Sequence, residues 1–283
     1  MTLCYLCHVS TMVTRIAPTP SGFLHRGNAF NFLLAQKIAR QQKGKVFLRI
    51  DDLDAQRVRD EYLEDIFQSL AWLGIDWDIG PAGVEDFKKN WSQTLRIDTY
   101  QKTLNTLRQK NLLFACQCSR KALSGFDLYP ETCLPKNILL DTDDVAWRIK
   151  LNKSTSVNFV DKLMGEINID LHKTTGCAVV RRRDGIAAYH IASLTDDENF
   201  GINTIVRGYD LLDSSALQLH LAHQLGFEKF SASSFYHHPL LQNTLGEKLS
   251  KSNGDDSLKA MRENGLKATA LIEAFETWWQ GVK

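Results

Sequence analysis

The stretch Arg15-Ile16-Ala17-Pro18-Thr19-Pro20-Ser21-Gly22-Phe23-Leu24-His25-Arg26-Gly27-Asn28 lies where the first predicted strand of the chain turns into the first predicted helix. Two prolines and a Ser-Gly pair interrupt the backbone, and an apolar helical pattern opens at Ala29 and runs to Gly44. A strand, a polar turn and a helix N-terminus in this order form an anion site, because backbone N–H groups and the helix dipole face one point. His25 and Asn28 add neutral side-chain donors beside it. The alternative is an ordinary strand-to-helix loop.

A second informative stretch, called here the lysine loop, is Gly246-Glu247-Lys248-Leu249-Ser250-Lys251-Ser252-Asn253-Gly254. Two lysines flank a serine, and glycines lie on both sides. A loop of this kind can fold over a polyphosphate and neutralise the charge that develops in a transition state. Taken alone, the same residues are equally typical of a solvated basic loop.

The composition is that of an ordinary globular protein with one large or two modest domains. Of its 283 residues, 43% are hydrophobic and 24% are charged, and the net charge is +1. An RNA partner would therefore need a local basic face. The chain has no apolar run long enough for a membrane span and no secretory pattern, so we expect a monomeric, cytoplasmic protein with no membrane partner and with its six cysteines reduced.

The first residues of the chain do not fit the pattern that follows. Cys4, Cys7 and His8 form C-x-x-C-H, which can mark haem attachment, but no export signal precedes them and no second pair for zinc is nearby. We expect residues 1–11 to be an N-terminal extension and translation to start at Met12.

Polar residues follow two predicted buried strands. Asp51 comes directly after the apolar strand Val46–Ile50, and Arg207 ends the apolar segment that starts at Ile205. Ligands of open α/β sheets bind at the carboxyl edge of the strands, and a guanidinium fork suits a carboxylate. The alternatives are a charged loop and a structural ion pair between Arg207 and Asp210. Helices are expected at residues 60–73 and 92–110, the second with an inward face of Leu95, Tyr100, Leu104 and Leu107.

Together, the first stretch and the lysine loop resemble the HIGH and KMSKS signatures of class I aminoacyl-tRNA synthetases. The segment Val46-Phe47-Leu48-Arg49-Ile50-Asp51-Asp52-Leu53-Asp54 resembles the RIED-D segment of the glutamyl and glutaminyl branch, and residues 73–78 resemble its LG-x-x-W-D segment. This resemblance implies an α/β fold: a doubly wound Rossmann-type parallel sheet with an inserted zinc-bearing connecting subdomain of mixed α+β structure and a short C-terminal helix.

The resemblance also implies domain boundaries. They are an extension at 1–11, the first half of the Rossmann catalytic domain at 12–111, the connecting subdomain at 112–184, the second half with the lysine loop at 185–255, and a C-terminal helix at 256–283 without an anticodon-binding domain. The strands expected between residues 145 and 180 are assigned to the insertion and not to the nucleotide-binding sheet. Arg181, Arg182 and Arg183 close the insertion as either a solvated turn or an RNA contact.

The middle of the chain carries a candidate metal site. Cys116 and Cys118 are followed by Cys133, which can bring three thiolates around one ion, although a structural zinc site takes four ligands. This arrangement resembles the glutamyl-queuosine branch of the family, which implies that Cys116, Cys118, Tyr129 and Cys133 bind Zn²⁺. Free thiols in a small core are the alternative.

The family also implies roles for the other motif residues. Arg15, Ser21, Asp51, Tyr189 and Arg207 would bind glutamate, although most family members have Glu where this chain has Asp51, which keeps glutamine open as a substrate. His25 and Asn28 would face the phosphates of ATP, which is accompanied by Mg²⁺. Lys248 and Lys251 would stabilise the departing pyrophosphate.

The implied activity is formation of glutamyl-adenylate and transfer of glutamate to the queuosine base in the anticodon loop of tRNA(Asp). Two alternatives stay open: a glutamyl- or glutaminyl-type ligase with another acceptor, and a non-catalytic paralogue that binds RNA. The presence of His25, Lys248 and Lys251 argues against the second.

Overall fold

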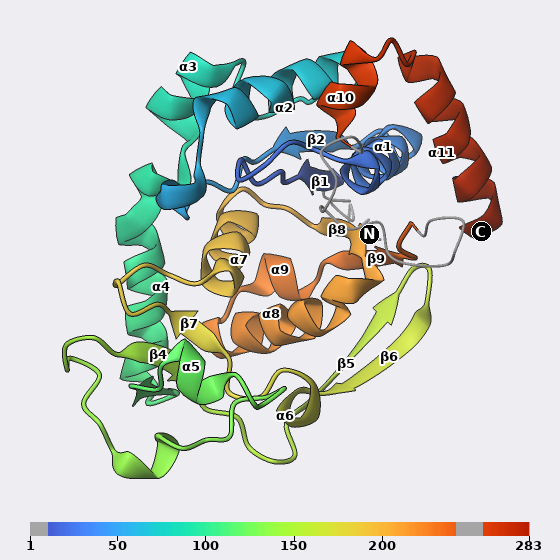
Figure 1. The fold of residues 1–283 in the computed structure, drawn as a ribbon. Helices are drawn as coiled ribbons and strands as arrows, with labels where there is room; N and C mark the ends of the chain where they lie inside the picture. Colours follow the sequence, from blue (N-terminus) through green and yellow to red (C-terminus); the bar gives the residue numbers. More distant parts are fainter. Residues whose placement is uncertain (1–10, 242–256, 283) are drawn as a thin grey trace, which may run out of the picture.

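A computed structural model describes residues 11–241 and 257–282 of the chain (Figure 1). Its main sheet has the strand order β2-β1-β8-β9-β5-β6, and every neighbouring pair is parallel except the β5–β6 hairpin. The strands are β1 (Val13–Ile16), β2 (Lys45–Leu48), β5 (Ser156–Asp161), β6 (Gly165–Asp170), β8 (Thr204–Gly208) and β9 (Ser234–His238). The expected α/β fold with a parallel sheet is confirmed.

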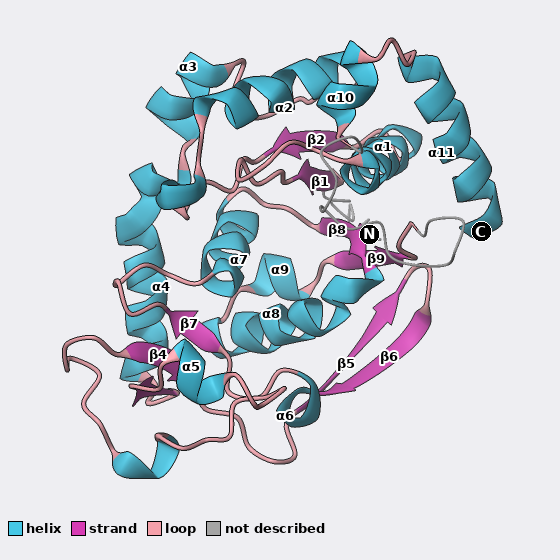
Figure 2. Ribbon diagram, in the orientation of Figure 1, coloured by secondary structure: helices cyan, strands magenta, loops and turns pink. Residues whose placement is uncertain are grey.

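Helices cover both faces of this sheet (Figures 1 and 2). Successive strand residues point to opposite faces, so Val46 and Leu48 of β2 join one apolar core whereas Phe47 joins the other. The first core is covered by α1 (Arg26–Gln41), α2 (Asp60–Trp72), α10 (Leu258–Glu263) and α11 (Ala268–Val282). The second is covered by α4 (Ile97–Gln109), α7 (Tyr189–Asn199), α8 (Leu212–Leu225) and α9 (Glu228–Ser231).

Helix α1 begins three residues earlier than the apolar pattern predicts. His25 is its N-cap: the His25 Nδ1 atom accepts a hydrogen bond from the Gly27 N–H at 3.1 Å, and Asn28 Oδ1 accepts one from the His25 N–H at 3.0 Å. This reciprocal capping box satisfies backbone donors that the helix itself cannot pair. The two motif residues thus fix where the helix starts.

The prediction of a helix over residues 92–110 with Leu95 facing inward is partly wrong. Residues 93–96 form a 3₁₀ turn capped by the Ser92 side chain, and the α-helix starts only at Ile97. Because a 3₁₀ turn has a different angular spacing, Leu95 falls out of phase with Tyr100, Leu104 and Leu107 and is 56% exposed, whereas those three are buried.

The C-terminal part is two helices instead of the single one expected. Gly265, with φ +79°, ends α10 (Leu258–Glu263) before α11 begins at Ala268. Met261 therefore belongs to α10, while Leu271 and Phe275 are buried on α11. The short helix α10 is held on α2 by Arg262, which donates to Asp65 at 2.7 Å and to Ser69 at 2.6 Å.

The connecting region contains a second sheet of three antiparallel strands in the order β3-β4-β7. Apart from β5 and β6, the described elements between β3 and β7 are two short helices, α5 and α6, and a 3₁₀ turn at Leu134–Lys136 (Figure 1). The elements not yet given are α3 (Val84–Asp86), β3 (Leu113–Cys116), α5 (Arg120–Leu123), β4 (Ala146–Ile149), α6 (Leu171–Thr174) and β7 (Val179–Arg181).

The assignment of every strand between residues 145 and 180 to a separate insertion is wrong for β5 and β6. Strand β5 pairs in parallel with β9 through Asp161 and Phe235, so the hairpin extends the main sheet. Asp161 makes this connection: one oxygen accepts from the Leu163 and Met164 N–H groups at 2.8 and 2.9 Å, and the other contacts the His237 backbone N–H and ring at 3.0 and 2.7 Å. The domain boundaries themselves stay a prediction.

In the described ranges, every helix is too short or too polar to span a bilayer.

Replacing Asp161 with asparagine should destabilise the protein by about 2 kcal/mol, because the amide NH₂ group would face buried N–H donors. Urea unfolding monitored by circular dichroism measures this change. The matched control is Asp143→Asn, since Asp143 is exposed. Equal stabilities of the two variants would contradict the role given to Asp161.

Candidate active site

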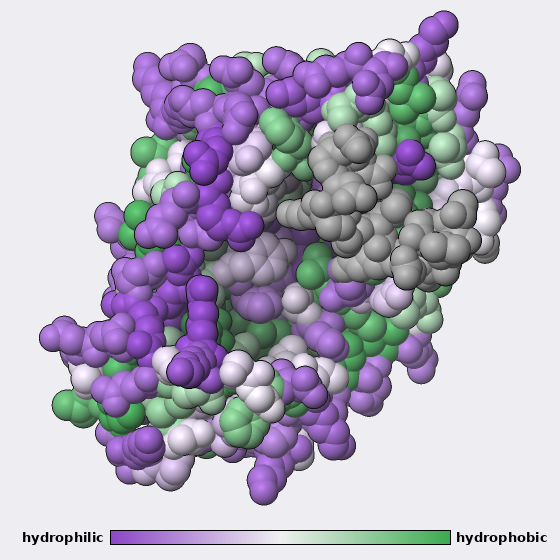
Figure 3. All heavy atoms as spheres, viewed as in Figure 1, coloured by the Kyte–Doolittle hydropathy of each residue, from purple (hydrophilic) through white to green (hydrophobic). Residues whose placement is uncertain are grey.

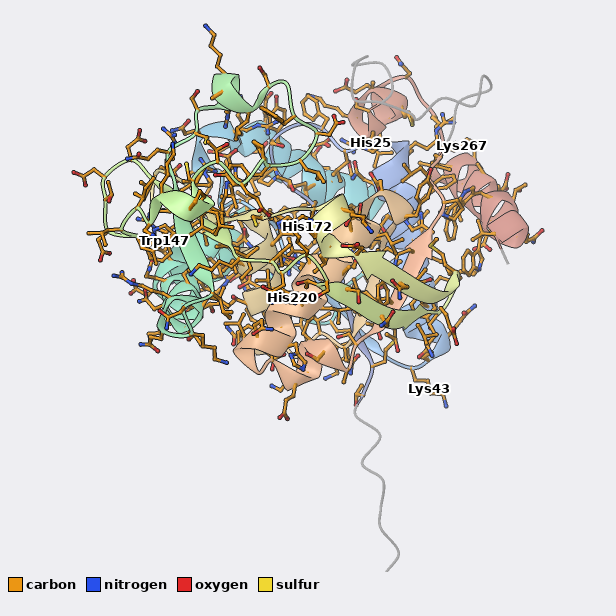
Figure 4. All side chains as sticks on the ribbon, turned by 90° about the horizontal axis from the view of Figure 1, so that it is seen from below. His25, Lys43, Trp147, His172, His220 and Lys267 are labelled. Carbon is orange, nitrogen blue, oxygen red and sulfur yellow. The ribbon has the colours of Figure 1, made fainter. Side chains whose placement is uncertain are left out.

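The motif residues converge at the carboxyl edge of the parallel sheet. Arg15 lies on β1 and its strand leads into the loop before His25, while Asp51 follows β2 and Arg207 lies near the end of β8. Figure 4 shows His25 next to α1 and the C-terminal helices, with Trp147 of the connecting region on the far side of the view. The expectation that these segments share one sheet edge is confirmed.

Backbone pairing brings Ser257, the third residue after the lysine loop, to the start of α1. His25 and Ser257 form an antiparallel bridge, and the Leu258 N–H donates to the Leu24 carbonyl at 2.7 Å. The predicted pyrophosphate ligands Lys248 and Lys251 lie outside the described residues, as do Cys4, Cys7 and His8. Ser257, three positions after the last residue of the lysine loop, thus lies beside the predicted anion site.

A buried ion network centred on Arg49 lies under the predicted amino-acid pocket. Arg49 donates to both oxygens of Asp51 at 2.6 and 3.1 Å and to Asp197 at 2.5 Å. It also donates to the Ser193 carbonyl and hydroxyl oxygens at 3.1 and 2.9 Å. Arg15 reaches Asp197 at 3.4 Å and the Val206 carbonyl at 3.2 Å. Pairing of this kind offsets the cost of burying Arg49, Asp51 and Asp197.

Asp51 is therefore fixed by two hydrogen bonds from Arg49, a contact that the sequence did not predict. Burial raises the pKa of its carboxyl group, while the adjoining Arg49 guanidinium acts in the opposite direction. Each carboxylate oxygen has two acceptor positions, so Asp51 can accept a further donor such as an ammonium group while bonded to Arg49.

Arg207 is almost fully buried, at 3% exposure, and is incompletely paired. One nitrogen donates to Gln218 Oε1 at 2.9 Å, whereas Nε and Nη2 have no hydrogen-bond partner among the described residues. Burial lowers the pKa of Arg207 to about 10. A buried guanidinium with two unused donors on one edge matches the bidentate geometry of a carboxylate.

The formal charges of this buried cluster do not cancel. Within the set formed by Arg15, Arg49, Arg207, Asp51 and Asp197, three positive charges meet two negative charges, which leaves +1. The neighbouring buried Asp196 is paired with Arg96 and is not counted in this set. A net positive charge away from water favours an anionic ligand. Glutamate, with a net charge of −1, neutralises the cluster, whereas glutamine does not.

The other two predicted pocket residues lie beside this cluster. Tyr189 is the first residue of α7, is 43% exposed and lies near Arg207. Ser21 is partly exposed in the loop that links β1 to α1, where its N–H donates to the Thr19 carbonyl at 2.9 Å. Their roles toward a ligand stay predictions.

A second buried network supports the same loops and was not foreseen from the sequence. Asp196 accepts hydrogen bonds from Arg96 at 2.9 Å, from the Tyr100 hydroxyl at 2.9 and 3.0 Å and from Gln93 at 3.0 Å. Asp52 accepts from the Ser92 hydroxyl at 2.5 Å. The sequence shows only that these charged residues lie within apolar segments. It does not identify the partners of Asp196, which lie about a hundred positions away.

The cysteines of the predicted metal site come together. The sulfur atoms of Cys116, Cys118 and Cys133 all lie within 4.8 Å of one another, with 3.5 Å between Cys118 and Cys133. The Tyr129 hydroxyl accepts from the Cys133 N–H at 2.9 Å and also interacts with Cys116. Sulfur atoms around a tetrahedral zinc ion are about 3.8 Å apart, so the residues fit such an ion.

Neighbouring groups divide the thiols into more and less acidic ones. Burial disfavours the Cys116 thiolate, but hydrogen bonds with Tyr129 and Arg148 outweigh it and lower the pKa to about 7. Burial and the two adjoining sulfur atoms raise the pKa of Cys118 to about 11. Three crowded thiols of this kind favour a cation that can neutralise them.

The sequence matches the family model described as tRNA synthetases class I (E and Q), catalytic domain, over residues 11–126 and 136–279. The chain therefore belongs to the class I tRNA synthetases of the E and Q type. Among solved structures, the chain is similar to a glutamate tRNA ligase from Elizabethkingia meningosepticum in complex with its amino acid. The TM-score is 0.76 at 24% identity over 94% of this chain and 60% of that one, which supports the fold alone.

Relatives with higher identity narrow the comparison. The chain is 34% identical over 276 residues to the glutamyl-Q tRNA(Asp) synthetase of Nitratidesulfovibrio vulgaris, covering 91% of this chain and 83% of the relative. It is 38% identical over 244 residues to the protein of that name from Pseudomonas fluorescens, covering 86% and 77%. A glutamate–tRNA ligase 1 from Ehrlichia chaffeensis is 31% identical, with 93% and 59% covered. The resemblance to the glutamyl-queuosine branch is confirmed.

A pH dependence follows from His190, whose ring contacts the Tyr189 ring with 5.5 Å between the ring centroids. Burial lowers the pKa of His190 to about 4, and the Arg207 charge adds to the decrease. The unfolded chain takes up this proton near pH 6.5, so the stabilisation is fully present above that pH and is lost as the pH falls toward about 4. At pH 5 this linkage lowers the free energy of unfolding by about 2 kcal/mol, and His190→Gln should remove that decrease.

Urea unfolding at about pH 7, 6 and 5 tests the expectation. The exposed His223, changed to glutamine, is the matched control. The same pH slope in both variants and the unmodified protein would show that His190 is not a source of the pH dependence.

Proposed function

We propose that this protein activates glutamate with ATP and transfers it to the queuosine base of tRNA(Asp). The observation that carries the proposal is the buried cluster with a net charge of +1, in which Arg207 has two donors without a described partner. The names of the relatives supply the acceptor. The family supplies the reaction class, an ATP-dependent ligation.

The amino acid is held by charge and hydrogen bonds. Arg207 pairs with a carboxylate of glutamate through its Nε and Nη2 atoms. Arg15, which bonds to Asp197, adds positive charge to the same cluster. Asp51 accepts the ammonium group. Tyr189 and Ser21 border the pocket. Because the pocket is positive before glutamate enters, binding favours glutamate over glutamine.

The activation step is an in-line displacement that needs no protein nucleophile. A carboxylate oxygen of glutamate attacks the α-phosphorus of ATP, the bond to the β-phosphate oxygen breaks, and pyrophosphate leaves. The N-terminus of α1, with His25 and Asn28, stabilises the phosphate charge through its N–H groups and dipole. Lys248 and Lys251 act from the lysine loop. Mg²⁺ would accompany ATP and offset phosphate charge.

His25 has a definite protonation pattern in this step. Its Nδ1 atom accepts the Gly27 N–H, so the neutral ring carries its proton on Nε2. The ring is thereby oriented as a donor at the start of α1, which agrees with the predicted role of a neutral donor toward phosphate.

The transfer step requires the RNA base to reach the adenylate. Bases in single-stranded loops can be splayed out and read individually, which suits a modified base of the anticodon loop. We further propose that the protein acts as a monomer in the cytoplasm, where thiols such as Cys116, Cys118 and Cys133 stay reduced.

Cys116, Cys118, Tyr129 and Cys133 would hold a zinc ion. The ion would supply a rigid structural link for the loop between β3 and β4, because a closed four-ligand site contributes directly to folding. The protein residues orient one another without it: the Cys133 N–H bonds the Tyr129 hydroxyl, and the Arg148 guanidinium lies 3.7 Å from the centre of the Tyr129 ring.

Arg207→Met should abolish glutamate-dependent ATP–pyrophosphate exchange, which in the unmodified protein should occur with glutamate and not with glutamine. Because Arg207 keeps an unneutralised charge away from water, the same change should leave the fold intact and raise the free energy of unfolding by about 1 kcal/mol.

The exchange assay uses labelled pyrophosphate with each amino acid, first without RNA and then with total tRNA. Lys229→Met, an exposed lysine on α9, is the control. Retained exchange in Arg207→Met would contradict the proposed pocket. Exchange by the unmodified protein with glutamine alone would show that glutamine, and not glutamate, is the substrate.

Cys118→Ser should reduce bound zinc from about one ion per chain to near zero and lower the thermal midpoint by several degrees. Emission spectroscopy of the purified protein measures the metal, and calorimetry measures the midpoint. Cys177→Ser is the control, because Cys177 is a buried thiol outside the cluster. Equal metal content in both variants would remove the zinc assignment.

A further inference from the structure

The Arg207 guanidinium is held by Gln218, a residue of α8 that belongs to none of the sequence motifs. The Gln218 side chain is fully buried, and its Oε1 atom accepts a hydrogen bond from Arg207 Nη1 at 2.9 Å. Because Oε1 meets this donor, the Nε2 group points the other way and donates to the His190 carbonyl over a longer distance of 3.5 Å. Gln218 thus connects β8 with the first turn of α7 and fixes the direction of the Arg207 side chain.

The position of Gln218 decides how it can influence a ligand. Helix α8 packs against α7, and α7 begins with the half-exposed Tyr189. Figure 3 shows that this face of the molecule is hollowed near its centre, over the part of the view where Figure 1 shows α7. Gln218 has no exposed surface, so it acts on a ligand through Arg207 and not through contact of its own.

The acceptor that Gln218 offers is neutral, in contrast to the acceptors of the other buried guanidinium groups in the cluster. Arg49 forms salt bridges with Asp51 and Asp197, and Arg15 forms one with Asp197. Arg207 forms no salt bridge within the described ranges, and its Nε and Nη2 atoms have no hydrogen-bond partner there. The amide therefore holds the guanidinium in place without neutralising its charge.

The pKa values of Arg49 and Arg207 reflect this difference in partners. Burial acts to lower the pKa of Arg49, but the charges of Asp197 and Asp51 outweigh it and raise the pKa well above its usual value. Burial lowers the pKa of Arg207 to about 10, and the charges of Arg15 and Arg49 add to the decrease. Two buried guanidinium groups thus differ because one meets carboxylates and the other meets an amide.

A carboxylate at position 218 would change the charge of the pocket with almost no change in shape, because Glu and Gln have nearly the same size. It would form the salt bridge that Arg207 lacks, and the charge of the cluster would fall from +1 to 0. Glutamate would then bring an uncompensated charge of −1 into the protein interior, which is unfavourable.

We propose that Gln218 is a positioning residue that sets the preference for an anionic amino acid. Its amide orients Arg207 and leaves both the positive charge and the Nε and Nη2 donors for the carboxylate of the substrate. The inference rests on the proposed function, because it concerns the same amino-acid pocket. It assigns part of the specificity to a residue that does not contact the substrate.

The first test measures glutamate-dependent ATP–pyrophosphate exchange by Gln218→Glu. The KM for glutamate should rise about tenfold or more, because the new carboxylate neutralises the cluster. The KM for ATP should stay within about twofold, since the phosphate site at α1 is unchanged. The control is Gln224→Glu, the same chemical change in the last turn of α8, which should behave like the unmodified protein.

Inhibition by glutamine separates a charge effect from damage to the pocket. Glutamine is neutral overall, so its inhibition constant in Gln218→Glu should change by less than about threefold while the KM for glutamate rises. A pocket that is merely distorted would bind both amino acids more weakly by the same factor. The ratio of the two constants therefore reports on charge alone.

A second variant, Gln218→Leu, removes the acceptor without adding a charge. Arg207 then loses its hydrogen bond to α8, so the KM for glutamate should rise about fivefold, again with little change in the KM for ATP. Thermal unfolding checks that each variant folds, and Gln218→Leu carries the test alone if the buried carboxylate of Gln218→Glu prevents folding.

An unchanged KM for glutamate in either folded variant, or an equal loss of glutamate and glutamine in Gln218→Glu, would overturn the inference. In both cases the unmodified protein would still show normal exchange. Absence of glutamate-dependent exchange in the unmodified protein, both without and with total tRNA, would instead overturn the proposed function, so the two failures are distinguishable.

Discussion

The active-site end of this fold depends on the pairing of Arg49 inside the protein. Arg49 is 2% exposed and lies just beyond β2, where its guanidinium bonds to Asp51, Asp197 and Ser193. Removing the partners of Arg49 would leave an uncompensated buried charge, which is strongly destabilising, so this network favours the observed positions of the loop after β2 and of helix α7. The same network holds Asp51 at the sheet edge and leaves Arg207 as the group with unused donors.

Specificity for an anionic amino acid then follows from incomplete neutralisation. The three guanidinium groups of this set are balanced by only two carboxylates, and the remaining positive charge lies in the protein interior. Such a cluster costs folding stability in the absence of ligand and provides binding energy in its presence. The cysteine cluster lies apart from this site, in the connecting region between β3 and β4.

Much of the fold and site was predictable because the signals are local. The turn before His25, the apolar strand before Asp51 and the short spacing of Cys116, Cys118 and Cys133 each place a functional group within a few residues of its structural cause. The predictions were wrong where the structure depends on the angular position of a residue in its helix or on the pairing of distant segments. Leu95 is exposed because a 3₁₀ turn shifts its phase, and β5 joins the main sheet because Asp161 bonds to His237, which lies 76 positions later.

The sequence by itself determined the family, the α/β architecture, the strand-to-helix turn before α1 and the grouping of Cys116, Cys118 and Cys133. The tertiary structure alone decided the partners of the buried charges. Arg49 meets Asp197 across 148 positions and Arg262 meets Asp65 across 197, and no periodicity or motif encodes such pairs. Helical and strand patterns report which face of an element is buried, whereas charge pairing depends on how the elements pack, which only the folded chain defines.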